Sequence, residues 1–425
     1  MPNFVSETVT CGSYAFLILI SNFQIATLPP ELWHQCMRWA TLPPSGRLPI
    51  DDSLTMLDPW PVGMPPMPCH YLAPETAYSF EQSRLYPTKR ALMLVSKAWA
   101  EIAVEFMYES IVIGDFRVGR AEQVFVALEG SAGFKQWVKR VDIFRSKDAC
   151  ERLARIGLPN LRVQNMFFNS NTKPELPTII LSEQPLHLEG PCGSPIIDRL
   201  SSRDETFGSL RCLTLWMVKP LPTPFHLPSN LRRLTIVALE ADFFRDQDIF
   251  STRDSIVLPN LTHLVVHDRY HSPDWSTRFT EIIKHFGPQL RHLTLSVVKR
   301  AQQWTGFDLC TILSVCAQLT ELVIPSHLGI WETEFDNYGH SALQTLGIPI
   351  MSGTSEWDCK PSFDIFSRRE SFPKLATIRL VSWGPEFGVY RWLEPYSLRL
   401  RDNGIRLENY WGRLIPPAPV PEDHN

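Results

Sequence analysis

Leu290-x-x-Leu293-x-Leu295 is one of seven short segments in which three large aliphatic residues keep the same spacing. The other six begin at Leu210, Leu231, Leu261, Leu319, Leu343 and Leu375. Their starts lie 21, 30, 29, 29, 24 and 32 residues apart. A motif that returns at such a period is typical of repeat proteins, in which each unit buries its apolar face against its neighbours. We therefore predict a stacked array that offers an extended surface to another macromolecule.

The alternation within each segment predicts a β-strand, because neighbouring side chains of a strand point to opposite faces. If Leu213 and Leu215 lie in the core, Cys212, Thr214 and Trp216 lie on the opposite, concave face. Short helices, such as the one that we expect before Leu319, would return the chain between strands. The side chains that we expect on the concave face, as candidate partner-binding residues, are Trp216, Arg233, His263, His267, His292 and Arg379.

Two helical patterns precede the array. The first starts at Leu28-Pro29-Pro30-Glu31, where Thr27 can cap the helix, and Leu32, Cys36 and Trp39 have the spacing of one buried stripe. The second starts with Thr88 as a cap and contains an apolar series, with Ser96 as a candidate junction between two helices. That series is Leu92, Val95, Trp99, Ile102, Ala103 and Phe106, and Lys89 lies among the charged residues expected on the other side.

The two patterns together resemble the F-box motif. Leu28-Pro29-Pro30-Glu31-Leu32 is similar to its Leu-Pro-x-Glu-Leu opening, and Val95-Ser96-Lys97-Ala98-Trp99 is similar to its Val-Ser-Lys-x-Trp ending. The whole chain resembles fungal F-box-like proteins with C-terminal leucine-rich repeats. The resemblance implies an α/β fold, in which a small three-helix module is followed by an irregular leucine-rich repeat solenoid.

The resemblance also implies a function and partners. The module would bind a Skp-type adaptor, and through it a cullin–RING ubiquitin ligase, while the concave face would hold an unknown protein substrate. The adaptor-binding residues would be Leu28, Pro29, Leu32, Leu92, Val95 and Trp99. No residue of this chain would act in catalysis, and no cofactor would be needed.

Two departures from the family leave an alternative open. Residues 42–87 separate the two halves of the motif by 46 residues, where the family has about a dozen. The repeats have Val218, Leu239 and Arg269 where the family commonly has an asparagine, so we expect an irregular array. The alternative is an interaction scaffold that has the same repeats but no association with a ligase.

Composition and sequence pattern also limit the possible domain division, partners and cellular compartment. We divide the 425 residues into a leader (1–24), a helical module (25–113) with a Pro-rich insertion (42–87), a repeat array (114–412) and a disordered tail (413–425). The net charge of −4 disfavours nucleic acid or an anionic membrane as the main partner. Nine cysteines without a C-x-x-C pair indicate reduced thiols and a cytoplasmic or nuclear protein.

Metal binding and catalysis have little support in the sequence. His267 and His271 have a zinc-like spacing but follow a predicted strand, and Cys69-His70 is a single pair in a Pro-rich segment. Phosphate-binding, dinucleotide-binding and nucleophile-elbow motifs are not found. We therefore expect no metal site. We rank the hypothesis of an enzyme with an unrecognised site below the two binding hypotheses.

Overall fold

We analysed a computed structural model of the 425-residue chain. It describes residues 29–41, 85–114, 118–144, 147–167, 187–191, 205–217, 227–238, 258–268, 282–297, 309–324, 339–348, 356–381, 393–409 and 412–415. The expected leader, nearly all of the Pro-rich insertion and the tail beyond Ile415 lie outside these residues.

Three helices form the N-terminal part of the described chain, and we call them the helical unit. They are α2 (Pro30–Thr41), the helix over residues 85–93 and α4 (Lys97–Glu109). Ser96 is confirmed as the junction, because its hydroxyl caps α4 by accepting a hydrogen bond from the backbone N–H of Trp99 at 3.2 Å. The expected cap at Thr88 is wrong, since that residue lies inside the second helix.

Twelve parallel strands follow in one sheet, and their order in the sheet is their order in the chain. The fold is therefore confirmed as α/β with a parallel sheet. The strands are β1 (Ser110–Gly114), β2 (Arg140–Phe144), β3 (Val163–Phe167), β4 (His187–Pro191), β5 (Cys212–Met217), β6 (Arg233–Ala238), β7 (His263–Asp268), β8 (His292–Val297), β9 (Glu321–Val323), β10 (Thr345–Ile348), β11 (Thr377–Leu380) and β12 (Arg406–Glu408). The sheet begins at Ser110, four residues before the boundary expected from the sequence.

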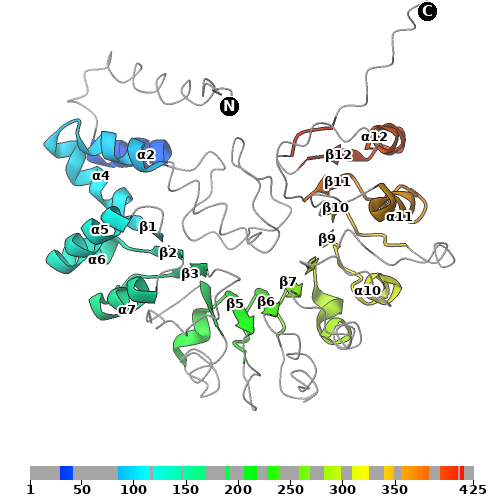
Figure 1. The fold of residues 1–425 in the computed structure, drawn as a ribbon, viewed down its shortest axis with the longest axis horizontal. Helices are drawn as coiled ribbons and strands as arrows, with labels where there is room; N and C mark the ends of the chain where they lie inside the picture. Colours follow the sequence, from blue (N-terminus) through cyan, green and yellow to red (C-terminus); the bar gives the residue numbers. More distant parts are fainter. Residues whose placement is uncertain are drawn as a thin grey trace, which may run out of the picture.

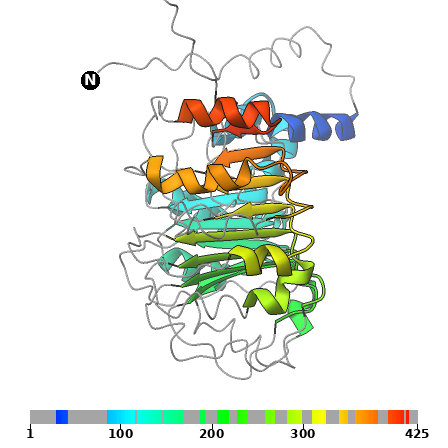
Figure 2. The same cartoon turned by 90° about the vertical axis from the view of Figure 1, so that its right-hand side faces the viewer.

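Figure 1 shows the strands along the inside of an open arc and the helices on its outside. The helical connections are α5 (Val118–Gly130), α6 (Ala132–Trp137), α7 (Lys147–Ile156), η4 (Glu205–Ser209), the helix over residues 282–286 with η5 (Gly287–Gln289), α10 (Leu309–Val315), α11 (Glu356–Phe366) and α12 (Leu393–Asp402). Viewed from the side, the strands lie one above another with helices along one face (Figure 2). One face of the sheet is therefore turned toward the middle of the arc, and we call it the inner face.

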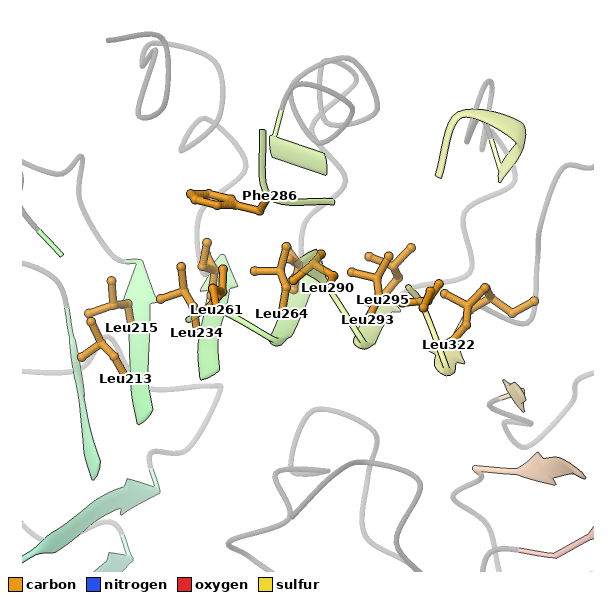
Figure 3. Packing of buried hydrophobic residues seen from close by; sticks show 14 of the residues in the cluster. Leu213, Leu215, Leu234, Leu261, Leu264, Phe286, Leu290, Leu293, Leu295 and Leu322 are labelled. Atoms are coloured by element: carbon orange, nitrogen blue, oxygen red, sulfur yellow. The ribbon is translucent and has the colours of Figure 1, made fainter. Parts of the chain in front are cut away.

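The core lies between the sheet and the outer helices. Each motif contributes one aliphatic residue before its strand and two in the strand or directly after it, as Leu290, Leu293 and Leu295 do for β8 (Figure 3). The same register position is occupied by Leu213, Leu234, Leu264, Leu293 and Leu322 in five successive strands. Each such side chain contributes about 1.5–3 kcal/mol relative to exposure. The strands expected from all seven motifs are present.

A tight turn precedes each of these strands and links neighbouring units. In Leu258-Pro259-Asn260-Leu261 the N–H of Leu261 donates to the carbonyl of Leu258 at 3.1 Å, and the side chain of Asn260 donates to the carbonyl of Ser229 at 3.1 Å. Equivalent side-chain bonds run from Asn160 to Gln136, from Asn230 to Gly208 and from Gln289 to Leu258. Side-chain amides thus join the units at the beginning of the strands, whereas the asparagine that the family commonly has after the strand is replaced in this sequence.

After the last strand, the chain folds back and pairs with that strand. After β12, Leu414 forms an antiparallel bridge with Glu408, and the N–H of Ile415 donates to the carbonyl of Leu407 at 2.9 Å. The hydroxyl of Ser397 in α12 also donates to the carbonyl of Ile415 at 3.0 Å. The expectation of a disordered tail from residue 413 is therefore wrong for residues 413–415, because they pair with the last strand.

Candidate functional site

The helical unit has its own small core. Trp33 and Met37 of α2 pack against Leu92 and against Trp99, Ala103 and Phe106 of the last two helices. The rings of Trp33 and Trp99 meet with centroids 5.0 Å apart. This core is separate from the cluster that lines the sheet, so the three helices are held together by their own side chains.

Several large apolar side chains of the same unit are left exposed. Leu32 and Trp39 of α2 are 43% and 74% exposed, and Leu94 and Val95, in the turn before α4, are 76% and 53% exposed. The predicted buried stripe of Leu32, Cys36 and Trp39 is therefore wrong: α2 buries Trp33, Met37 and Thr41 instead. Exposed apolar residues on a small unit are typical of a protein-binding surface.

The residues expected to contact an adaptor divide into two groups. Pro29, Leu32 and Val95 are exposed and are available to a partner. Leu92 and Trp99 are buried in the core of the helical unit, so we correct their assignment from contact residues to packing residues. Leu28 lies outside the described residues.

Glu109 joins the helical unit to the sheet. Its buried carboxylate lies 2.9 Å from Nζ of Lys139, next to β2, and 3.3 Å from the guanidinium of Arg38 in α2. Lys89, expected on the charged outer side, is instead buried. Burial lowers the pKa of Lys89 to about 8, and the charge of Glu109 partly opposes that change. Three cations thus surround one carboxylate at the junction between the two parts of the protein.

The centre of the inner face carries a row of polar side chains at one register position. Arg233, His263, His292 and Glu321 follow one another on β6, β7, β8 and β9. The rings of His263 and His292 stack with centroids 3.9 Å apart, and Nδ1 of His292 lies 2.8 Å from Oε2 of Glu321. Oγ1 of Thr262 lies 2.8 Å from Nδ1 of His263. The expected histidines at these two positions are therefore brought together by the strand register.

Not every residue expected on this face is accessible. Arg233 is only 4% exposed, so the expectation of an exposed contact residue is wrong for it. Strand spacing explains the burial, because side chains on adjacent strands cover one another. Trp216 and His267 lie in β5 and β7, but their side chains lie outside the described part of the structure.

Arg379 lies at the C-terminal end of the inner face. Its guanidinium donates to Oε2 of Glu408 on β12 at 2.6 Å. Arg406 approaches the same carboxylate at 3.6 Å and donates to the hydroxyl of Thr377 at 3.0 Å. Arg379 is thus held by a neighbouring strand, and only part of its side chain faces solvent.

A buried polar group near the other end was missed by sequence reasoning. Arg140 and Asp142 of β2 form an ion pair at 2.8 Å, and the amide of Asn165 on β3 donates to Asp142 at 2.5 Å. All three side chains are almost fully buried. Alternation with the core residues Val141 and Ile143 places Arg140 and Asp142 on the inner face and could have identified them.

Among the described residues, no group of three or more His, Cys, Asp or Glu side chains is arranged to hold a metal ion. None of the helices in the described ranges has an apolar run long enough to cross a membrane. No family model matches the sequence, and no curated protein matches it.

Proposed function

We propose that this protein is the substrate-recognition subunit of a Skp–cullin–RING ubiquitin ligase. Its F-box-like helical unit binds the Skp-type adaptor, and its irregular leucine-rich repeat solenoid binds a protein substrate. The main support is the coexistence of two features in one chain. A three-helix unit exposes Leu32 and Val95, and a twelve-stranded parallel sheet in chain order follows it directly.

The physical basis of the adaptor contact is the exposed apolar surface of the helical unit. Leu32 and Trp39 lie on the face of α2 that is turned away from Trp33 and Met37. Burying a leucine or valine side chain in an interface contributes about 1.5–3 kcal/mol. Polar substitution at one such position is therefore expected to weaken adaptor binding by at least about tenfold.

The proposed mechanism is proximity. The repeats hold the substrate while other subunits of the ligase transfer ubiquitin to a lysine, and no side chain of this chain takes part in bond formation. The cytoplasm or the nucleus is the compartment that fits this role, and the free thiols of Cys36, Cys150 and Cys316 suit a reducing environment.

The test is a pull-down of the full chain with a purified Skp-type adaptor. We expect the wild type to bind, and Leu32→Asp and Val95→Asp to bind at least tenfold more weakly. Val126→Asp is the matched control, because Val126 is also an exposed apolar residue (58%) but lies in α5, outside the helical unit. Failure of the wild type to bind, or equal loss in the control, would disprove the ligase role.

The second candidate is a scaffold that binds a partner through the same sheet but does not bind an adaptor. The 46 residues between the two halves of the F-box-like motif favour it. Purification of the full chain from cells, followed by mass spectrometry, separates the two hypotheses. A scaffold brings down a partner without adaptor or cullin, whereas a ligase subunit brings down all three.

A further inference from the structure

The exposed large apolar side chains of the described residues gather on the helical unit. Leu32 and Trp39 of α2 are among them, and so are Leu94 and Val95 in the turn before α4. In the rest of the described chain, such side chains are found on α5, on α12 and after β12, at Val126, Leu398 and Leu414. Apolar surface is unfavourable in water, so a cover over the helical unit would stabilise it.

The regular part of this surface is one face of α2. Leu32, Gln35 and Trp39 are exposed and lie three and four residues apart, so they form a single line along the helix. We call these three residues the α2 stripe. It is about 10 Å long at about 1.5 Å of rise per residue. Trp33 and Met37 are buried instead, so the α2 stripe faces away from the core of the helical unit.

The chain that leads into α2 contains an apolar run of its own. Residues 14–20 read Tyr-Ala-Phe-Leu-Ile-Leu-Ile, and no charged residue occurs between Glu7 and Glu31. These residues lie outside those that the structure describes, so their composition and their distance from α2 along the chain are the relevant facts. An uncharged apolar run of this kind gains free energy when it packs on another apolar surface.

The connection between this run and α2 is long enough for such a contact. Pro29, where the description of the helical unit begins, comes nine residues after Ile20. Nine extended residues span at most about 30 Å, which exceeds the length of the α2 stripe. Since both surfaces belong to one chain, the effective concentration of one at the other is in the millimolar range, and even a weak contact is populated.

We propose that residues 14–20 of this chain pack on the α2 stripe and cover it until the adaptor displaces them. The competition with the adaptor rests on the proposed function, because Leu32 belongs to both contacts, whereas the contact within the chain does not. The chain's own segment fits better than a second copy of the protein. It is present at any protein concentration, and it contains no charge that would have to leave water.

Photo-cross-linking from position 39 tests the contact within the chain. The full chain with Trp39→p-benzoylphenylalanine is irradiated at two protein concentrations, and the joined peptides are identified by mass spectrometry. We expect a product within one chain that joins position 39 to residues 14–20, in equal yield at both concentrations. Val126→p-benzoylphenylalanine is the matched control, because Val126 is also exposed and apolar but lies on α5. Products between two chains, products of position 39 without residues 14–20, or equal capture of residues 14–20 from position 126 would overturn the proposal.

Adaptor affinity tests the competition. The test variant is the full chain with Leu17→Ser, Ile18→Ser and Leu19→Ser, and thermal unfolding verifies that each variant is folded. The control removes three exposed apolar side chains outside the helical unit, through Val126→Ser, Leu398→Ser and Leu414→Ser. If residues 14–20 cover the stripe in about nine molecules of ten, the test variant binds the purified Skp-type adaptor about tenfold more tightly than the wild type. The control should bind like the wild type.

Unchanged or weaker adaptor binding by the test variant overturns the competition, and so does equal tightening in the control. If the adaptor binds neither the wild type nor the test variant, the ligase role and the competition both fail. The cross-link from position 39 still decides the contact within the chain in that case, so the two proposals fail separately.

Discussion

The imidazole of His263 lies parallel to that of His292 on the next strand, at an interplanar angle of 11°. Burial of His263 lowers its pKa, and the charge of the neighbouring His292 ring, stacked this closely, acts in the same direction. The stack therefore contains one ring that the folded protein keeps neutral.

Acid should destabilise the fold through His263. The unfolded chain binds a proton there near pH 6.5, whereas the folded protein does so only near pH 3. The unfolded state holds more protons in this window, so the unfolding free energy falls as the pH falls. Relative to His263→Gln, the wild type should lose up to about 1.4 kcal/mol per pH unit below 6.5. Urea unfolding of both proteins at pH 6.5 and at pH 5 measures this, and a constant difference between them would contradict the prediction.

Lys89 should make stability depend on pH in the alkaline range. Its pKa is lowered from 10.5 to about 8, first by burial, so the folded protein releases this proton before the unfolded chain does. The unfolding free energy should then rise with pH above 8, by up to about 1.4 kcal/mol per unit relative to Lys89→Met. Denaturant unfolding at pH 8 and at pH 9 tests the slope. If both proteins change in parallel over this range, the lysine is not buried as described.

A close contact at Gly287 should make the site intolerant of a side chain. A Cβ atom there would lie 2.6 Å from Cγ1 of Val315 and 3.1 Å from Sγ of Cys316. Gly287→Ala should therefore lower the unfolding free energy by about 1–3 kcal/mol. Gly208→Ala is the control, because a Cβ at this glycine, also in a 3-10 helix, meets nothing within 4 Å. Thermal unfolding should separate the two variants, and equal stability would refute the contact.

The sheet could be predicted from the sequence because its motif is repeated. Each Leu-x-x-Leu-x-Leu segment specifies a turn, a strand and a buried face by itself, and seven copies leave little ambiguity. The turn at Leu258-Pro259-Asn260-Leu261 was not predicted, and neither was the role of Asn260. Its side chain bonds to the preceding unit, a contact between units that no single segment reveals.

The faces of α2 could not be assigned in this way. Leu32 with Trp39 and Trp33 with Met37 both have helical spacing, because the helix is apolar on more than one side. The choice depends on Trp99, 66 residues beyond Trp33, whose ring packs on that of Trp33. Periodicity carries no information on such a partner, so the contact surface and the core of the helical unit were partly exchanged in the prediction.

The burial of inner-face residues could not be predicted from the sequence either. Strand alternation places Arg233 and Arg140 on that face correctly, but it does not say how far their neighbours cover them. Arg140 is buried together with Asp142 and Asn165, which come from a later position and from another strand. Exposure depends on the side chains of adjacent strands, and these lie 20–30 residues away in the sequence.

Helix α4 ends at Glu109 and strand β1 begins at Ser110, so no hinge residue lies between the helical unit and the sheet. The carboxylate of Glu109 also ties Arg38 on one side to Lys139 on the other. The helical unit and the sheet are therefore joined without a linker, and these ion pairs hold them in one relative orientation. A protein held by the sheet would be presented to a protein held by the helices at one set angle, and the reach between the two would be a constant of this molecule.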